Sequence, residues 1–212
     1  MKKHILVLDY GIGNIKSILA AFSKFEQNII LGSSNEEFDN AKAVILPGVG
    51  AFKHGMQKLK EKKLDSKIIE FASTKKPIMG ICLGMQMLFS NSEEFGSTAG
   101  LNLIEGSVKK LPSSDNQKLP NIGWLKIKIS DQEEPLISNI KSTDSFYHIH
   151  SFYAEPKEPN NILAKTNFFD KAYCSIAKKG NIFGCQFHPE KSGDQGLEII
   201  KNFVGISNNY DS

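Results

Sequence analysis

Cys82 lies between two glycines in the segment GICLGMQ, residues 80–86. The pattern Gly-x-Cys-x-Gly, between an apolar run and a helix-like run, is typical of a nucleophile elbow, where a strand turns sharply into a helix and exposes the central side chain. A thiol at the start of a helix faces the positive end of the helix dipole, which favours the thiolate. We therefore expect Cys82 to be a nucleophile. The alternative is a buried structural cysteine beside two packing glycines.

A thiolate nucleophile needs a base, and His188 in the segment FHPE is the candidate. Residues 182–187 are strand-like, and alternate residues of an extended chain point to one side, so His188 and Glu190 can lie together. A carboxylate beside an imidazole orients the ring and stabilises the imidazolium. The spacing predicts a Cys82–His188–Glu190 triad. The alternative for His188 is a strand-end histidine with a satisfied hydrogen bond.

A second glycine-containing turn, LPGVGAF at 46–52, follows another apolar run. Glycines on both sides of Val49 let a backbone N–H turn toward a negative charge that develops on a substrate oxygen, together with the N–H of Leu83. We expect an oxyanion hole at Val49, Gly50 and Leu83. A structural glycine turn is the alternative, and a phosphate-binding P-loop is excluded because no Gly-Lys-Ser/Thr follows.

Apolar runs and segments of helical spacing alternate in the first half of the chain. Continuous apolar runs at 4–9, 43–47 and 76–81 are typical of strands buried on both faces of a parallel sheet. Helical spacing occurs at 14–25, 51–64, 64–73 and 193–206. From residue 100 onward, short strand-like segments are separated by Pro, Asn, Asp and Gly. We expect one three-layer α/β domain over 1–212, with a mostly parallel central sheet and extra antiparallel strands in the C-terminal half.

Composition narrows the function classes. The net charge is only +3 and all 26 basic residues are lysines, so bidentate arginine contacts to nucleic acid are absent. Gly, Pro or Asp interrupts every apolar run before the ~18 residues that a membrane span needs. The first residues lack the long apolar region of a signal peptide, so we expect a cytoplasmic protein. Three cysteines without a CxxC pair indicate neither a disulfide framework nor zinc, and we expect no metal and no cofactor.

The two other cysteines lie on a predicted hairpin. If the chain turns at Lys179 and Gly180, a two-residue turn places Cys174 opposite Cys185. In a reducing compartment both are expected to be buried thiols and not a disulfide.

Six segments distributed over residues 4–208 together resemble one family. They are DYGIGNIKSI (9–18), LPGVGAF (46–52), GICLGMQ (80–86), IGW (122–124), FYHIHSFY (146–153) and QFHPEKSG (186–193). In this order they resemble the class I (triad) glutamine amidotransferases, and more closely the glutaminase subunits of imidazole glycerol phosphate synthases. The resemblance implies a flavodoxin-like fold and no cofactor.

The resemblance also implies an activity. Cys82 would attack the side-chain amide of glutamine, His188 would move the proton and Glu190 would orient the imidazole. Gly50, Gln86, His150 and Ser151 match positions that hold glutamine. The ammonia would pass to a partner (β/α)8-barrel cyclase, which makes imidazole glycerol phosphate and aminoimidazole carboxamide ribotide in histidine biosynthesis.

The partner of such a subunit would dock near Asn14, Trp124 and Lys191, which match family positions, and near Asn121. This chain departs from the usual family pattern at Asn121 and Leu125, where the family has histidine and asparagine, and at His148, where an aromatic or apolar residue is common. Because these departures are expected near the docking surface, they leave a second partner open, a sugar amidotransferase of surface-polysaccharide synthesis. A catalytically silent regulatory subunit is the third hypothesis.

Overall fold

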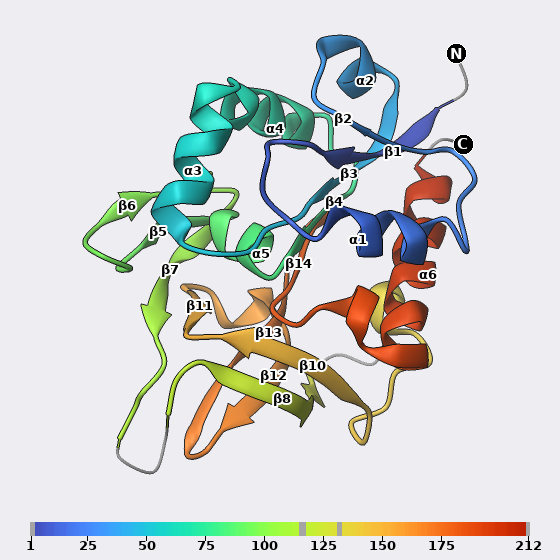
Figure 1. Ribbon diagram of the computed structural model, residues 1–212. Helices are drawn as coiled ribbons and strands as arrows, with labels where there is room; N and C mark the ends of the chain where they lie inside the picture. Colours follow the sequence, from blue (N-terminus) through green and yellow to red (C-terminus); the bar gives the residue numbers. More distant parts are fainter. Residues whose placement is uncertain (1–2, 115–117, 131–132, 211–212) are drawn as a thin grey trace.

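An eight-stranded sheet forms the centre of the computed structural model, which describes residues 3–114, 118–130 and 133–210 (Figure 1). Its strand order is β2–β1–β3–β4–β14–β13–β12–β9. The first five strands in that order are parallel, and the last three join antiparallel. Their bounds are β2 Ile29–Gly32, β1 His4–Leu8, β3 Ala41–Leu46, β4 Ile78–Ile81, β14 Ile182–Cys185, β13 Lys171–Lys179, β12 Ile162–Phe168 and β9 Lys128–Ile129. The predicted mixed α/β architecture is confirmed.

Helices cover both faces of this sheet, as Figure 1 shows. On one face lie α1 (Ile15–Phe22) and α6 (Gly193–Asn209), and on the other α3 (Phe52–Glu61), α4 (Leu64–Ser73) and α5 (Leu83–Met87). In β1, Ile5 and Val7 pack with the first pair of helices, while Leu6 and Leu8 pack with the second group. A strand buried on both faces needs apolar residues at every position, which explains the continuous apolar runs. No helix in the described ranges has the length and apolar character to cross a membrane.

Two elements near the start of the chain were not predicted. Strand β2 is a short edge strand whose residues are only partly buried. It is followed by α2 (Asn35–Asp39), whose first turn is closed by a capping box between Ser34 and Glu37. The sequence Ser-x-x-Glu is a recognised helix-start signal and could have revealed α2.

The described residues between 89 and 156 add two small sheets. A two-stranded antiparallel ribbon consists of β8 (Asn121–Lys126) and β10 (Ser145–His150). A four-stranded sheet has the order β11–β7–β5–β6, with β11 at Phe152–Pro156, β7 at Ile104–Lys110, β5 at Phe89–Ser92 and β6 at Thr98–Ala99. Three 3-10 turns connect elements, η1 at Pro135–Ile137, η2 at Pro159–Asn161 and η3 at Pro189–Lys191. The helix after Cys82 ends sooner than its apolar spacing suggests, because the chain enters β5 at Phe89.

The predicted register of the β13–β14 hairpin is wrong. Lys179 pairs with Ile182, so the turn lies at Gly180–Asn181, with Gly180 at φ 57°, and Cys185 faces Ile176. A bulge at Ser175, between the pairs Lys165–Cys174 and Ala164–Ile176, then reverses the alternation of β13. Cys174 therefore packs on the opposite face of the sheet from Cys185. Cys174 and Cys185 are buried, free thiols, as expected, and Cys82, which was expected to be exposed, is only 7% exposed.

Candidate active site

Cys82 occupies the sharp turn that joins β4 to α5, with φ 54° and ψ −110°. Such a conformation is strained for a residue with a Cβ atom and typically costs about 1–3 kcal/mol. The neighbouring glycines allow the close approach that the turn needs. A Cβ on Gly84 would lie 1.8 Å from the carbonyl oxygen of Leu46, and one on Gly80 would lie 2.6 Å from that of Gly84. The turn thus has the geometry of the predicted elbow.

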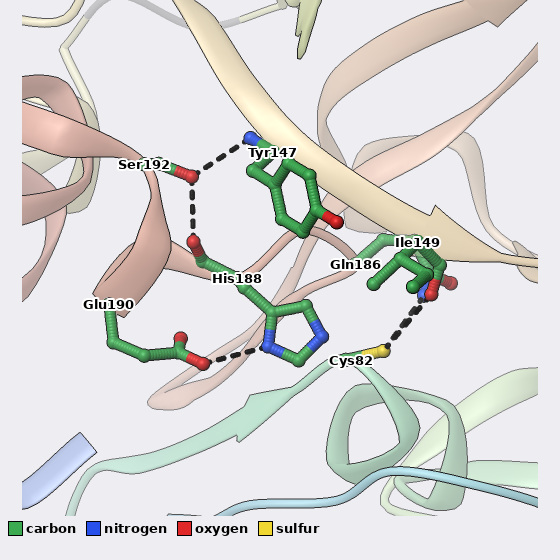
Figure 2. A network of polar contacts seen from close by, with 7 residues as sticks. All are labelled: Cys82, Tyr147, Ile149, Gln186, His188, Glu190 and Ser192. Carbon is green, nitrogen blue, oxygen red and sulfur yellow. Dashed lines mark hydrogen bonds and ion pairs between the residues drawn. The ribbon is translucent and has the colours of Figure 1, made fainter. Parts of the chain in front are cut away.

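Strand β14 brings His188 to this turn. It runs parallel to β4, with Gly184 beside Gly80 and Cys185 beside Ile81, and the N–H of Cys82 donates to the carbonyl of Cys185 over 2.7 Å. The backbone of His188, three residues beyond the end of β14, is held by two hydrogen bonds. Its N–H donates to the carbonyl of Tyr147 (3.0 Å), and its carbonyl accepts from Ser192 Oγ (2.6 Å), as Figure 2 shows for Ser192.

The imidazole of His188 lies between Glu190 and Cys82 (Figure 2). Its Nδ1 is 2.8 Å from Glu190 Oε1, and the Glu190 side chain is fully buried. The prediction that His188 and Glu190 lie together is confirmed. The predicted backbone between them is wrong, because residues 189–191 form the η3 turn and not an extended strand. Pro189 at the start of this turn holds the short connection in shape.

The surroundings of His188 favour its charged form. Burial by itself lowers the pKa of His188, but the hydrogen bonds and charges of Cys82 and Glu190 outweigh it and raise the pKa to about 10. A buried carboxylate is costly unless it is paired, and the imidazolium of His188 is the pairing group here. The arrangement therefore stabilises a histidine that carries a proton next to the thiol.

A cavity of about 330 Å³ opens over Cys82 and His188. The predicted residues that line it are Val49, Gly50, Leu83, Gln86, His150, Ser151 and Lys191. Sequence reasoning missed four further lining residues, which are Glu94, Pro120, Ile149 and Phe152. Gly50, at φ 91°, has the left-handed backbone that the expected turn of an oxyanion loop requires. A cavity of this size, with a thiol and an imidazole at one end, suits a small polar substrate.

The side chain of Gln86, which lines the cavity, contacts a second glutamine, Gln186. Gln86 Nε2 donates to the carbonyl of Phe152 (2.9 Å) and to Gln186 Oε1 (3.1 Å). Gln186 is fully buried, and its Nε2 is 4.0 Å from Cys82 Sγ. Gln186 was not predicted as a site residue, although it begins the segment QFHPEKSG. Both N–H groups of Gln86 are used inside the protein, so only its oxygen is left to meet a substrate.

The four predicted docking residues are placed differently from one another. Trp124 is 56% exposed and packs against Tyr147 with the rings tilted by 59°. Lys191 is exposed at the cavity, and Asn14 is half-buried at the start of α1. Asn121 is only 4% exposed, and its amide faces His150 and Tyr173. Its assignment to a partner surface is therefore wrong, because its side chain points into the protein.

The alternation of the β8–β10 ribbon explains this placement. Asn121 pairs with His150, Gly123 with His148 and Leu125 with Phe146, and these pairs share the inner face. The outer face carries Ile122, Trp124, Tyr147 and Ile149. All three departures from the family pattern, at positions 121, 125 and 148, thus belong to the inner face. They no longer support a different partner.

The fold and the family comparison agree on the class of protein. A family model described as "Glutamine amidotransferase class-I" matches residues 6–206. The fold is similar to that of a putative GMP synthase component from Thermoplasma acidophilum, with TM-score 0.72 and 20% identity over 100% of this chain and 96% of that one. PurLQS from Thermotoga maritima gives TM-score 0.73 and 19% identity over 97% and 99%. The chain belongs to the class I glutamine amidotransferase family.

Relatives with higher sequence identity indicate the subgroup within this family. The chain is 43% identical over 210 residues to "Imidazole glycerol phosphate synthase subunit HisH 1" of Legionella pneumophila (strain Lens), covering 95% of this chain and 99% of that protein. It is 40% identical over 208 residues to the HisH protein of Bacillus cytotoxicus, covering 98% and 97%. Within the family, the chain therefore groups by sequence with the HisH subunits, and the resemblance expected from the motifs is confirmed.

Proposed function

We propose that this chain is a glutaminase subunit of an imidazole glycerol phosphate synthase, and that it hydrolyses glutamine to glutamate and ammonia. The thiolate of Cys82 adds to the amide carbon of glutamine, and the C–N bond breaks as the imidazolium of His188 protonates the leaving nitrogen. Water then adds to the thioester, His188 takes its proton, and the C–S bond breaks to release glutamate. The observation that carries this proposal is the buried Glu190–His188 pair beside a strained, cavity-facing Cys82.

Val49, Gly50 and Leu83 stabilise the oxyanion in this proposal. They line the same cavity as Cys82, Val49 and Gly50 on the loop that follows β3 and Leu83 at the start of α5, after β4. A Cβ on Gly48 would lie 2.8 Å from the backbone nitrogen of Gly84, so these two segments are in close contact. Backbone N–H groups of such segments can be directed at the developing oxyanion without reorganisation. Gln86, His150 and Ser151 line the same cavity and complete the glutamine site.

Glu94 is the carboxylate in the cavity that suits the α-ammonium group of glutamine. It lines the cavity, and its Oε2 accepts from the N–H of Phe52 at the start of α3 over 2.6 Å. We expect Glu94→Gln to raise the KM for glutamine about tenfold, since a charge-assisted bond is lost, with kcat within about threefold. Steady-state glutaminase assays measure both values. The side chain introduced by Glu94→Gln keeps an oxygen that can accept from the N–H of Phe52. The matched control is Glu93→Gln, at the adjacent position. A fall in kcat without a rise in KM would contradict the assignment.

A docking partner is proposed from the HisH relatives, whose names make them subunits of a synthase. The outer face of the β8–β10 ribbon supports this, because Ile122, Trp124 and Ile149 are 58%, 56% and 38% exposed. Val49, 42% exposed, lines the cavity together with Ile149, so apolar surface continues to the cavity opening. Clustered exposed apolar side chains are typical of protein interfaces. A cyclase docked here would receive the ammonia from the cavity.

The test of this function is glutaminase activity with and without a (β/α)8-barrel cyclase and its nucleotide substrate. We expect the cyclase to raise the activity and to bind this chain as a heterodimer, and Trp124→Ala to weaken both effects. The matched control is Phe169→Ala, at another exposed aromatic residue outside this patch. No stimulation by the cyclase, or stimulation by an N-acetylsugar amidotransferase instead, would overturn the proposed partner. Failure of a glutamine-analogue electrophile to label Cys82 would overturn the glutaminase itself.

A further inference from the structure

Four polar side chains form a buried cluster under the β8–β10 ribbon. Asn121 and His150 contribute from paired positions, His148 from the next inner position of β10, and Tyr173 from β13. None is more than 6% exposed. Tyr173 Oη is central, lying 3.0 Å from His148 Nδ1, 3.1 Å from Asn121 Nδ2 and 3.2 Å from His150 Nε2. Buried polar groups in such contact must agree on where each proton lies.

The proton of His150 can be placed first. Its Nδ1 lies 2.8 Å from the carbonyl oxygen of Phe152, which can only accept, so Nδ1 is the donor. Burial lowers the pKa of His150 to about 4, and the charge of His188 acts in the same direction. At neutral pH the ring is therefore uncharged, and its Nε2 is an acceptor that needs a donor.

The proton of His148 follows from its surroundings. Its Nε2 is buried and has no hydrogen-bond partner among the described residues, and the ring packs on Phe187 with centroids 5.6 Å apart. A buried N–H without a partner is a rare and costly arrangement. Burial lowers the pKa of His148 well below its usual value, so the ring is neutral at neutral pH. Its proton accordingly belongs on Nδ1, which donates to Tyr173 Oη. The amide N–H of Asn121 also donates to this oxygen, so the single O–H of Tyr173 is left for His150 Nε2.

These assignments give a chain of hydrogen bonds with one direction. It runs from His148 through Tyr173 and His150 to the carbonyl of Phe152, which also accepts from Gln86 Nε2. Gln86 continues to Gln186, whose Nε2 faces Cys82 Sγ. The chain therefore reaches from the cluster to the segment 149–152, which lines the cavity, and to the thiol.

We propose that Tyr173 and His148 are positioning residues for the glutamine site, acting by holding His150 with its proton on Nδ1 and thereby fixing the carbonyl of Phe152 and the side chain of Gln86. The proposal rests on the glutaminase function proposed above. Neither residue touches the cavity, so both act through His150. Loss of the Tyr173 hydroxyl removes the shortest contact of His150 Nε2 to a donor and leaves only the longer ones, to His148 Nδ1 (3.3 Å) and Asn121 Nδ2 (3.4 Å). The link from His148 through Tyr173 to His150 is then broken.

The first test does not depend on activity. In the ¹⁵N-histidine NMR spectrum of the wild-type protein we expect two rings that stay neutral between pH 5.5 and 8 with the proton on Nδ1, and both change in Tyr173→Phe. The signals of both rings should stay unchanged in the matched variant Tyr153→Phe, because Tyr153 packs on Tyr173 but donates to Glu155. A proton on Nε2 of His150, or a charged His150 at neutral pH, would overturn the proposal.

The second test is kinetic. In the complex with the cyclase, we expect Tyr173→Phe to raise the KM for glutamine about tenfold, because one hydrogen bond that orders the binding segment is lost. The kcat and its pH profile should stay nearly unchanged. Tyr153→Phe should leave both constants within about twofold, as expected for a substitution outside the chain of bonds. Equal effects of the two variants, or a loss confined to kcat, would contradict a positioning role. Absence of any glutaminase activity in the wild type would instead remove the proposed function, while the NMR result would still decide the proton positions.

Discussion

Cys82→Ala is expected to remove essentially all glutaminase activity, lowering kcat/KM by about 10⁵-fold or more, as loss of a nucleophile does in related mechanisms. No other described thiol can replace it, because Cys174 and Cys185 are buried in the two apolar cores and burial raises the pKa of both. Glutamine binding should persist, since the oxyanion loop and the segment 149–152 are untouched. Glutaminase assays and glutamine titration of the variant measure the two effects separately.

The strained turn allows a control for folding. Alanine has the same Cβ atom as cysteine, so the strain at φ 54° remains, whereas Cys82→Gly removes it. The glycine variant should therefore be as inactive as the alanine variant but more stable, by about 1 kcal/mol in the free energy of unfolding. More than about 1% residual activity in either variant would mean that Cys82 is not the nucleophile.

Glu190→Gln is expected to lower kcat by about 10³–10⁴-fold, the effect of losing the orienting carboxylate in comparable triads. Glu190 accepts from His188 Nδ1, which directs Nε2 at Cys82. An amide nitrogen at the same place would donate to Nδ1 and put the proton of the neutral ring on Nε2. The ring would then be unable to take the proton of the thiol.

The pH profile of the same variant gives an independent measurement. The charge and hydrogen bond of Glu190 help to raise the pKa of His188 to about 10, so the imidazolium that protonates the leaving ammonia persists to alkaline pH. Without the carboxylate the pKa of His188 falls, and the alkaline limb of kcat/KM for the residual activity moves to lower pH. Glu198→Gln, a carboxylate on α6 paired with Lys201, is the control and should leave the limb in place. An unmoved limb in Glu190→Gln would contradict the role of this carboxylate.

Much of the fold could be predicted because its signals are local. The runs at 4–9, 43–47 and 76–81 became β1, β3 and β4, and the helical spacings became α1, α3, α4 and α6 within a few residues. Strand β2 gave no such signal, since a short, half-buried edge strand needs no continuous apolar run. The register of the β13–β14 hairpin was missed because the turn lies at Gly180–Asn181, one residue later than predicted, which makes Ile176 and not Cys174 the partner of Cys185.

The residues of the candidate site also divide into those that the sequence predicts and those that it does not. The glycines around Cys82, the pair His188 and Glu190, and the Val49 turn are readable from the sequence, because each requirement involves residues close together in the chain. Glu94 and Gln186 carry no local signal of this kind. Asn121 was misplaced because one position along a strand decides between the outer and the inner face, and only the pairing with His150 shows which face it takes.

The sequence by itself determined the chemical groups of this protein and the local turns that expose them, since backbone strain and residue spacing act over a few residues. Only the tertiary structure decided that these groups meet. The parallel pairing of β14 with β4 sets Cys185 beside Ile81, and this register puts His188 next to Cys82. Such pairing depends on burying two distant strands in one sheet, a cooperative, long-range effect that no short segment encodes. The same packing placed two of the three departures from the family pattern, Asn121 and His148, in the buried cluster around Tyr173.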